Sequence, residues 1–386
     1  MIIKKEKLEL LHSIRGFAAL LVVIGHAKFH FWSGGAEFIK HYPMNLWNFF
    51  DYLLFAFDML TSNPALMVVV FFVLSGFFIA YSFDSNQWSL SNFYINRTIR
   101  IYIPYLSSLL FTVLLFYLTI KLNSSIFQSI NPSEYNQGLV AHFNHFDIQT
   151  FLWNLIFVAN PYYIGYNDPY WSLLIEAFFY IVAPFFIKRP KLFMVISGFL
   201  LIIGLYFGTY LSFINLYNPL KSFITLYAFF FALGFYTYWL IFKYRIQDVI
   251  KRINVWWYNS FAIFLLLTAI YGIFIFDYKY TYLIGGLFTV LMIYRLIIYP
   301  VKSSYVVKFF ISMGKISYSM YLIHVPIFIL MYALLVKFTG QEVFYARIYW
   351  IPTIIVVLLS YPFYYLVEHQ TLKMIKWYKK KCSSKS

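Results

Sequence analysis

Residues 11–32 read LHSIRGFAALLVVIGHAKFHFW, an apolar run long enough to cross a bilayer as one helix. The run nevertheless contains Arg15 and His26. At about 100° and 1.5 Å per residue, the eleven-residue step between them is three turns plus roughly 20°, so both fall on one helical face about 16 Å apart. Ionisable groups cost about 2.5–3.5 kcal/mol each at the centre of a spanning helix, so this pair is a candidate functional feature. His30, one turn beyond His26, has no assigned role.

The composition predicts a membrane protein. Of the 386 residues, 62% are hydrophobic and 11% are charged, whereas soluble domains have shares near 45–50% and 25%. We expect an all-α polytopic membrane helix bundle of about ten transmembrane helices, forming one domain over residues 1–370, with a basic, disordered cytoplasmic tail over residues 371–386. The apolar runs of suitable length are 11–32, 64–83, 102–121, 170–187, 192–212, 221–242, 258–276, 281–300, 309–335 and 348–367.

The net charge of +16 is explained by membrane topology. Threading the ten runs from an inside N-terminus puts twenty of the 30 Lys and Arg residues on the cytoplasmic side and seven on the other. This bias follows the positive-inside rule and predicts that both termini are cytoplasmic. We therefore expect a multi-pass protein of the plasma membrane, the inner membrane in bacteria, whose partner is the lipid bilayer and not nucleic acid.

Other apolar runs also carry small or polar residues. Ser75 and Gly76 form a small pair in the second run, which is typical of close helix packing. Glu176 lies within the fourth run after Trp171, and an acid there needs a partner, for which Arg15 is a candidate, or a wet cavity. His324 precedes Pro326 and shares a helical face with Tyr321, a position that suits either a packing residue or a functional one.

Three segments outside the spans leave alternatives open. Residues 46–58 have the pattern of a helix in the outer interface. Arg97 and Arg100 are three residues apart, so they form either topological charges, which spacing alone favours, or a fork for phosphate oxygens. His142 and His145, in the outer segment 122–169, are interpreted as solvated residues, and no metal site is expected because they lack a third clear ligand.

Four segments in this order resemble the signature segments of the acyltransferase-3 family of integral membrane O-acyltransferases. They are LHSIRGFAALLVVIGH, FFVLSGFFIAYSF followed by RTIRIYIPY, YWSLLIEAFFYIVAP, and ISYSMYLIHVPIF. The resemblance covers essentially the whole chain. The chain is similar to those family members that consist of the membrane domain alone. It implies a ten-helix core that transfers an acyl group, commonly acetyl from acetyl-CoA, to a hydroxyl of a cell-surface or exported carbohydrate. The chain departs from the family pattern at His12, near Val69 and after Glu368.

The resemblance also implies roles for individual residues. His26 would be the general base or a transient acyl carrier, with Arg15 and Glu176 holding geometry and charge. Arg97 and Arg100 would bind acyl-CoA, which enters as donor substrate without a metal cofactor. Four further residues are predicted to contact the substrate or support the catalytic residues: Ser75, Trp171, Tyr321 and His324.

A different class of protein also fits some of these residues. In a transporter or flippase for a glycan or an anionic substrate, Arg15, Glu176 and His324 would line a translocation path. Such proteins display internal symmetry with broken helices at matching places, which this sequence does not. Acyl transfer is therefore the preferred prediction. Three points stay open. They are the identity of the acceptor, the choice between direct transfer and an acyl-enzyme, and the oligomeric state, for which a homo-oligomer is one possibility.

Overall fold

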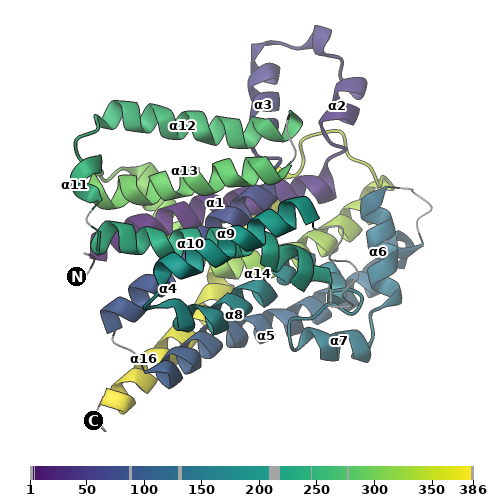
Figure 1. Cartoon of the computed structure of the whole chain (residues 1–386). Helices are drawn as coiled ribbons and strands as arrows, with labels where there is room; N and C mark the ends of the chain where they lie inside the picture. Colours follow the sequence, from purple (N-terminus) through teal and green to yellow (C-terminus); the bar gives the residue numbers. More distant parts are fainter. Residues whose placement is uncertain are drawn as a thin grey trace. The chain divides into compact units, whose positions relative to one another are not determined.

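The computed structural model describes residues 3, 5–86, 89–128, 133–207, 218–244, 246–275 and 278–383. Within these ranges the chain forms helices, turns and loops without a β-strand, which confirms the predicted all-α fold (Figure 1). The α-helices are α1 (Lys5–Phe31), α2 (Gly35–His41), α3 (Phe49–Leu60), α4 (Pro64–Asn86), α5 (Leu90–Leu122), α6 (Glu134–Asn144), α7 (Ile148–Asn154), α8 (Trp171–Val182), α9 (Pro190–Phe207), α10 (Asn218–Phe242), α11 (Gln247–Ile250), α12 (Val255–Tyr271), α13 (Tyr278–Ile298), α14 (Tyr305–Thr339), α15 (Trp350–Phe363) and α16 (His369–Ser383).

The predicted spans coincide with apolar helices. Eight helices in the described ranges are long and apolar enough to cross a membrane. The predicted spans 192–212 and 258–276 correspond to the shorter apolar helices Pro190–Leu205 and Val255–Tyr271, and residues 208–212 and 276 lie outside the described ranges. The chain is thus a polytopic helix bundle.

Two boundaries differ from the sequence-based expectation. The helix expected over residues 102–121 begins at Leu90, so Arg97 and Arg100 lie on a helix and not in a connector. Pro104 lies inside this helix, as membrane-spanning helices tolerate. The tail expected to be disordered continues as α16 to Ser383. The physical reason is that Thr371 and Ile375, one turn apart, are buried and dock the helix by one face.

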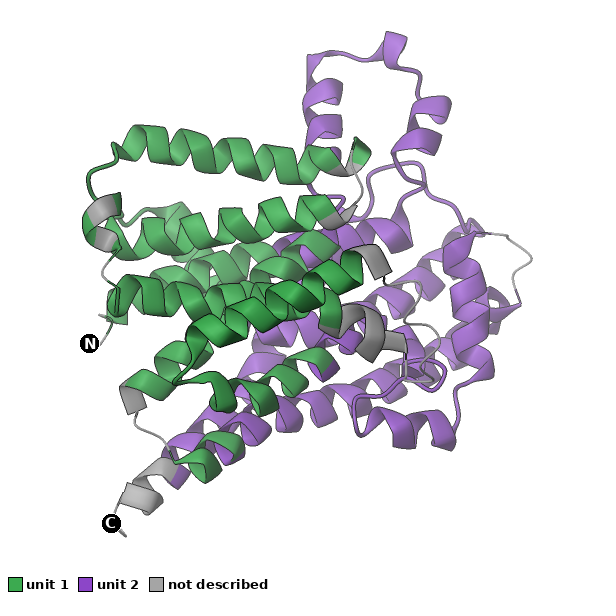
Figure 2. Cartoon of the chain, in the orientation of Figure 1, with its two compact units in different colours: residues 1–19, 65–94, 175–315 green, residues 20–64, 95–174, 316–386 purple. Residues whose placement is uncertain are grey.

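The chain divides into two compact units (Figure 2). Unit 1 comprises residues 1–19, 65–94 and 175–315, and unit 2 comprises residues 20–64, 95–174 and 316–386. Among the described helices, α1, α4, α5, α8 and α14 each begin in one unit and end in the other. Arg15, Ser75 and Glu176 belong to unit 1, and the remaining candidate residues belong to unit 2.

Small residues bring α4 and α10 of unit 1 into backbone contact. A Cβ atom added at Gly76 would overlap the carbonyl oxygen of Phe231, and one added at Gly234 would overlap that of Val73. Each glycine therefore faces the backbone of the other helix. The structure confirms the prediction that Ser75-Gly76 marks close packing, because only a residue without a side chain permits this approach.

A methyl group at Gly234 is expected to destabilise the protein. In Gly234→Ala the two helices must separate, because a backbone carbonyl cannot turn away as a side chain can, and such overpacking costs about 1–3 kcal/mol. Gly198→Ala in α9 is the matched control, since its Cβ would meet nothing within 4 Å. Thermal unfolding in detergent should give a lower midpoint for Gly234→Ala only. Equal midpoints for the two variants would refute the close contact.

Helices α2 and α3 form an excursion of unit 2 between α1 and α4 (Figure 1). Asn48 and Asp51 form a reciprocal capping box at the start of α3, in which each side chain bonds the other residue's backbone N–H. Phe50, Leu54 and Phe57 are exposed. This exposure fits the predicted interfacial helix, whose contact with lipid remains a prediction.

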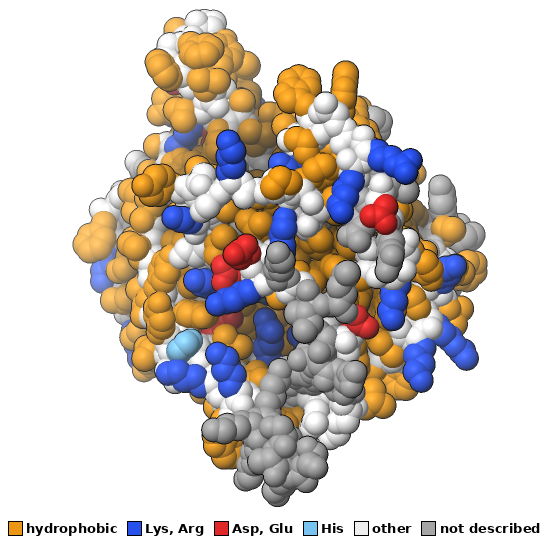
Figure 3. All heavy atoms as spheres, turned by 90° about the vertical axis from the view of Figure 1, so that its left-hand side faces the viewer, with side chains coloured by type: hydrophobic (Ala, Val, Ile, Leu, Met, Phe, Trp, Pro, Cys, Tyr) orange, Lys and Arg blue, Asp and Glu red, His pale blue; other side chains and the backbone are white. Residues whose placement is uncertain are grey.

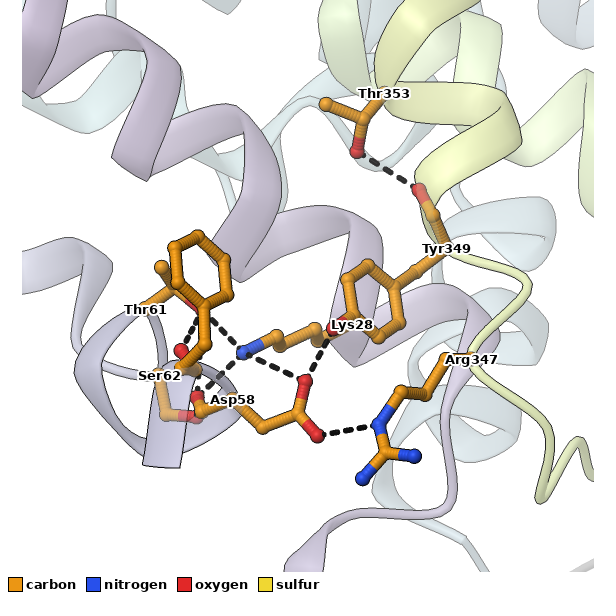
Figure 4. Close-up of polar contacts among 8 residues, drawn as sticks. Lys28, Asp58, Thr61, Ser62, Arg347, Tyr349 and Thr353 are labelled. Atoms are coloured by element: carbon orange, nitrogen blue, oxygen red, sulfur yellow. Dashed lines mark hydrogen bonds and ion pairs between the residues drawn. The ribbon is translucent and has the colours of Figure 1, made fainter. Parts of the chain in front are cut away.

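The excursion returns to the bundle through a buried ionic cluster around Asp58 (Figure 4). Arg347 Nε lies 2.8 Å from one carboxylate oxygen of Asp58, and Tyr349 donates its hydroxyl to the other. The ammonium group of Lys28 lies 3.8 Å from the second oxygen. Lys28 also donates to the backbone carbonyl of Asp58, at 2.5 Å, and to the hydroxyl of Thr61. The cluster joins α1, α3 and the segment before α15.

The surface is rich in exposed apolar side chains. Figure 3 shows hydrophobic side chains over much of one face, with Lys and Arg side chains between them. Trp256, Trp257 and Phe264 of α12 are 72%, 69% and 61% exposed. Exposed apolar area of this extent suits a protein that lies in a bilayer.

Candidate active site

Two histidines from distant parts of the sequence meet in unit 2. His26 Nδ1 of α1 lies 2.7 Å from His324 Nε2 of α14. Their rings are parallel, at an interplanar angle of 3° and a centroid separation of 4.9 Å. His324 is fully buried and His26 is half-buried. The structure therefore places the predicted base, His26, in direct contact with the predicted supporting residue, His324.

The hydrogen bonds of His324 determine which nitrogen of His26 carries a proton. His324 Nδ1 lies 2.8 Å from the carbonyl oxygen of Tyr321. A carbonyl oxygen can only accept, so Nδ1 is the donor and the Nε2 of a neutral His324 carries the lone pair. His26 Nδ1 must then donate to His324 Nε2. This leaves the lone pair of His26 on Nε2, the nitrogen available to take a proton from a substrate.

A proline and an asparagine shape α14 next to His324. Pro326 has no backbone N–H, so the carbonyl of Leu322, four residues earlier, loses its helical partner. Asn167 Nδ2 donates to that carbonyl at 3.1 Å. Asn167 itself is fully buried. A residue from the outer segment thus satisfies the carbonyl that Pro326 leaves without a partner, and α14 continues to Thr339.

Tyr321 lies one turn before His324 and connects α14 to the start of α8. Its hydroxyl donates to the carbonyl oxygen of Pro169 at 2.5 Å and lies 2.6 Å from Ser172 Oγ. Ser172 is buried, whereas its neighbour Trp171 is half-buried. Within unit 2, Tyr321 therefore holds the segment that carries Trp171. Whether Trp171 contacts substrate stays a prediction.

The carboxylate of Glu176 is held by hydroxyl groups of unit 1. Ser75 Oγ donates to Glu176 Oε1 at 3.0 Å, and the hydroxyl of Tyr180 donates to the same oxygen. These are the hydrogen bonds of Glu176 in the described part of the chain, so the candidate ion pair with Arg15 is not observed. Two hydroxyls can satisfy a carboxylate without a cation because each donates one proton.

The two arginines of the predicted donor site lie on α5. Arg97 is buried and Arg100 is half-buried. Their three-residue spacing on a continuous helix makes them neighbours on one face. Arg15 and His26 likewise lie on one uninterrupted helix, α1, as predicted.

The interpretation of His142 as a solvated loop residue is wrong. His142 is buried on α6, with Nε2 3.0 Å from Asp168 Oδ1 and Nδ1 2.7 Å from the carbonyl oxygen of Gly138. The imidazole ring of His142 stacks on the ring of Tyr166 with a centroid separation of 4.2 Å. The segment forms a helix that turns His142 inward, which spacing alone did not indicate. In the described ranges no three His, Cys, Asp or Glu side chains gather as metal ligands.

Three polar residues with specific contacts in the structure, Glu368, His30 and Tyr135, have no role predicted from the sequence. Glu368 lies in a π-helical turn, Tyr364–Glu368, and accepts a hydrogen bond from Ser319 at 2.8 Å. His30 and Tyr135 are buried, and their rings are in contact with a centroid separation of 4.7 Å. An acid in an apolar run and a π-helical turn are both signals of function. The contact of His30 with Tyr135 had no sequence signal.

These apolar helices define a multi-pass membrane protein with a pair of hydrogen-bonded histidines in unit 2. The model of the acyltransferase-3 family, described as an acyltransferase domain, matches residues 9–369. The chain belongs to this family and is a membrane acyltransferase. No curated protein and no solved structure is significantly similar to it.

Proposed function

We propose that the protein transfers an acyl group, acetyl in the simplest case, from cytoplasmic acyl-CoA to a hydroxyl of a cell-surface or exported carbohydrate. The observation that carries the proposal is the hydrogen-bond chain from the Tyr321 carbonyl through His324 to His26, which leaves a lone pair on His26 Nε2. A hydroxyl becomes a competent nucleophile when such a base removes its proton.

The proposed reaction runs through one addition and one elimination. The acceptor oxygen attacks the thioester carbonyl carbon while His26 Nε2 takes the hydroxyl proton. The carbon–sulfur bond then breaks, and the thiolate of CoA leaves with the proton that the imidazolium returns. His324 accepts a hydrogen bond from His26 Nδ1 throughout and so stabilises the imidazolium. A route through an acyl group on His26 Nε2 uses the same lone pair.

In the topology proposed from the charge distribution, the acyl donor and the carbohydrate acceptor lie on opposite sides of the membrane, with the donor on the cytoplasmic side. Lys and Arg predominate in the connectors predicted to be cytoplasmic, where acyl-CoA is found. We propose the plasma membrane, the inner membrane in bacteria, as the location. The family assignment favours acyl transfer over the transporter alternative.

Mass spectrometry of surface glycans from cells with and without the protein tests this function. We expect an ester mass on one sugar residue in cells with the protein, and its loss in cells without it. Isotope-labelled acetate in the medium identifies an acetyl donor, and a longer chain gives a larger mass. Identical glycan masses in both strains would overturn the proposed carbohydrate acceptor.

Lysine substitution of both donor-site arginines is expected to weaken acyl-CoA binding. Arg97→Lys/Arg100→Lys keeps the charge but removes the bidentate fork that suits phosphate oxygens. Losing charge-assisted hydrogen bonds of about 1.5–3 kcal/mol predicts a KM for acyl-CoA that is roughly tenfold higher or more. The control is Arg295→Lys, whose guanidinium bonds Asn259 at 2.9 Å. An unaltered affinity would assign Arg97 and Arg100 to topology.

A further inference from the structure

Two neighbouring side chains of unit 2, His30 and Tyr135, each bury a polar atom that has no hydrogen-bond partner in the described part of the chain. Among the described residues, neither His30 Nδ1 nor the hydroxyl of Tyr135 has a partner, although the two residues are only 6% and 7% exposed. Most buried polar groups in folded proteins are hydrogen-bonded, and an unsatisfied one costs free energy. Two such atoms on touching rings therefore call for a common explanation.

The two side chains lie next to the histidines of the active site. His30 follows His26 by one turn of α1, a rise of about 6 Å along the helix. The ring of Phe328 contacts the rings of both His30 and His324, with centroid separations of 5.5 Å and 5.9 Å. The rings of His30 and Tyr135 meet edge to face, at 85°. The unpartnered atoms thus belong to the surroundings of His26.

The chemistry of the two groups fits an alcohol. A neutral imidazole nitrogen and a phenol can each exchange a hydrogen bond with a hydroxyl, which both donates and accepts. Burial raises the pKa of the Tyr135 hydroxyl well above its ordinary value, so the hydroxyl keeps its proton at neutral pH. Tyr166 stacks on Tyr135 at 5.9 Å and adds an apolar aromatic wall. Hydroxyls beside apolar C–H groups are the features of a sugar ring.

We propose that His30 and Tyr135 form an acceptor subsite, which binds a second hydroxyl of the sugar and orients the reacting hydroxyl toward His26 Nε2. This inference rests on the proposed function and names the part of the site that selects the acceptor. The subsite positions the substrate and takes no proton during the reaction.

Tyr135→Phe removes only the hydroxyl, and His30→Phe replaces the imidazole, with both its nitrogens, by an apolar aromatic ring. For Tyr135→Phe and His30→Phe we expect a KM for the acceptor that is about three- to tenfold higher, as for one lost neutral hydrogen bond. The KM for acetyl-CoA should stay unchanged. The assay uses purified protein in lipid vesicles, labelled acetyl-CoA, and surface glycan from the same cells freed of esters by mild alkali.

Tyr332→Phe is the matched control. Its ring contacts Tyr135 edge to face at 4.8 Å, but its hydroxyl has partners in Asn136, at 3.1 Å, and the Glu342 carbonyl, at 3.0 Å. Removing a partnered hydroxyl should lower the thermal unfolding midpoint and leave the acceptor KM unchanged. Removing the unpartnered hydroxyl of Tyr135 should leave the midpoint unchanged or raise it.

The outcomes separate this inference from the function on which it rests. An active wild-type protein whose acceptor KM is unaltered by Tyr135→Phe and His30→Phe would overturn the subsite alone. A lower unfolding midpoint for Tyr135→Phe, with an unchanged KM, would also overturn it in favour of a structural role. A wild-type protein that acylates no glycan would overturn both the function and the subsite.

Discussion

Asparagine in place of His26 is expected to lower the rate of acyl transfer by about 10²–10⁴-fold, the usual contribution of a general base. The amide nitrogen of asparagine lies close to the position of His26 Nδ1, so the variant can still donate to His324 Nε2. It has no lone pair at the position of Nε2. The substitution therefore separates the loss of the base from the loss of the contact between α1 and α14.

Variants of His324 test the hydrogen-bond chain independently. His324→Gln provides an oxygen that can accept from His26 Nδ1 and should retain more activity than His324→Phe, which cannot. Because the two histidines act as a unit, His324→Phe should add little to the loss already caused by His26→Asn. The measurement is the initial rate of labelled acetyl transfer by protein in vesicles. A His26→Asn protein with wild-type rates would exclude His26 as base and as acyl carrier.

The second large effect is expected from Asp58→Asn, which should lower the free energy of unfolding by about 3–5 kcal/mol. Asp58 is fully buried, and its carboxylate is the anion between Lys28 and Arg347. Neutralising it leaves two cations with little access to water, and this costs far more than the ion pairs themselves contribute. The midpoint of denaturant-induced unfolding in detergent gives the measurement.

The control for Asp58 is an exposed ion pair on the same excursion. Glu37 lies 2.5 Å from Lys40, and both side chains are largely in solvent. Glu37→Gln should hardly change the unfolding midpoint, because exposed pairs are screened and mobile. A loss for Asp58→Asn no larger than that for Glu37→Gln would show that the cluster is not closed to water. Adding Arg347→Gln to Asp58→Asn should recover part of the stability, since one unpaired cation is then removed.

Two features of the sequence explain which parts of the site could be predicted: the helical periodicity of its residues and the free-energy cost of ionisable side chains in apolar runs. Arg15, His26 and Glu176 stand out because an ionisable side chain in an apolar run is expensive. The Ser75-Gly76 pair predicted close packing, and Gly76 faces the backbone of α10 as expected. Helix class and approximate span positions followed from run length alone. These inferences need only the local sequence and the energetics of the bilayer.

The partners of these residues depended on tertiary structure. His26 and His324 are 298 residues apart, and no local pattern shows that their rings stack. Glu176 accepts hydrogen bonds from two hydroxyl groups, whereas the sequence had offered Arg15 as a candidate partner. Lys28 is one of the seven Lys and Arg residues that the predicted topology places on the outer side, yet it is buried against Asp58. A single sequence gives the cost of a buried polar group but does not identify the group that offsets it.

The bond between Asn167 and the Leu322 carbonyl makes two distant positions depend on each other. Pro326 creates the free carbonyl, and Asn167 supplies the proton that satisfies it. A homologue that replaces Pro326 restores the helical bond and no longer needs a donor at position 167. One that replaces Asn167 while keeping the proline is left with an unsatisfied carbonyl two residues from His324. In evolutionary terms the two positions should change together, so covariation between them traces how the histidine is held across the family.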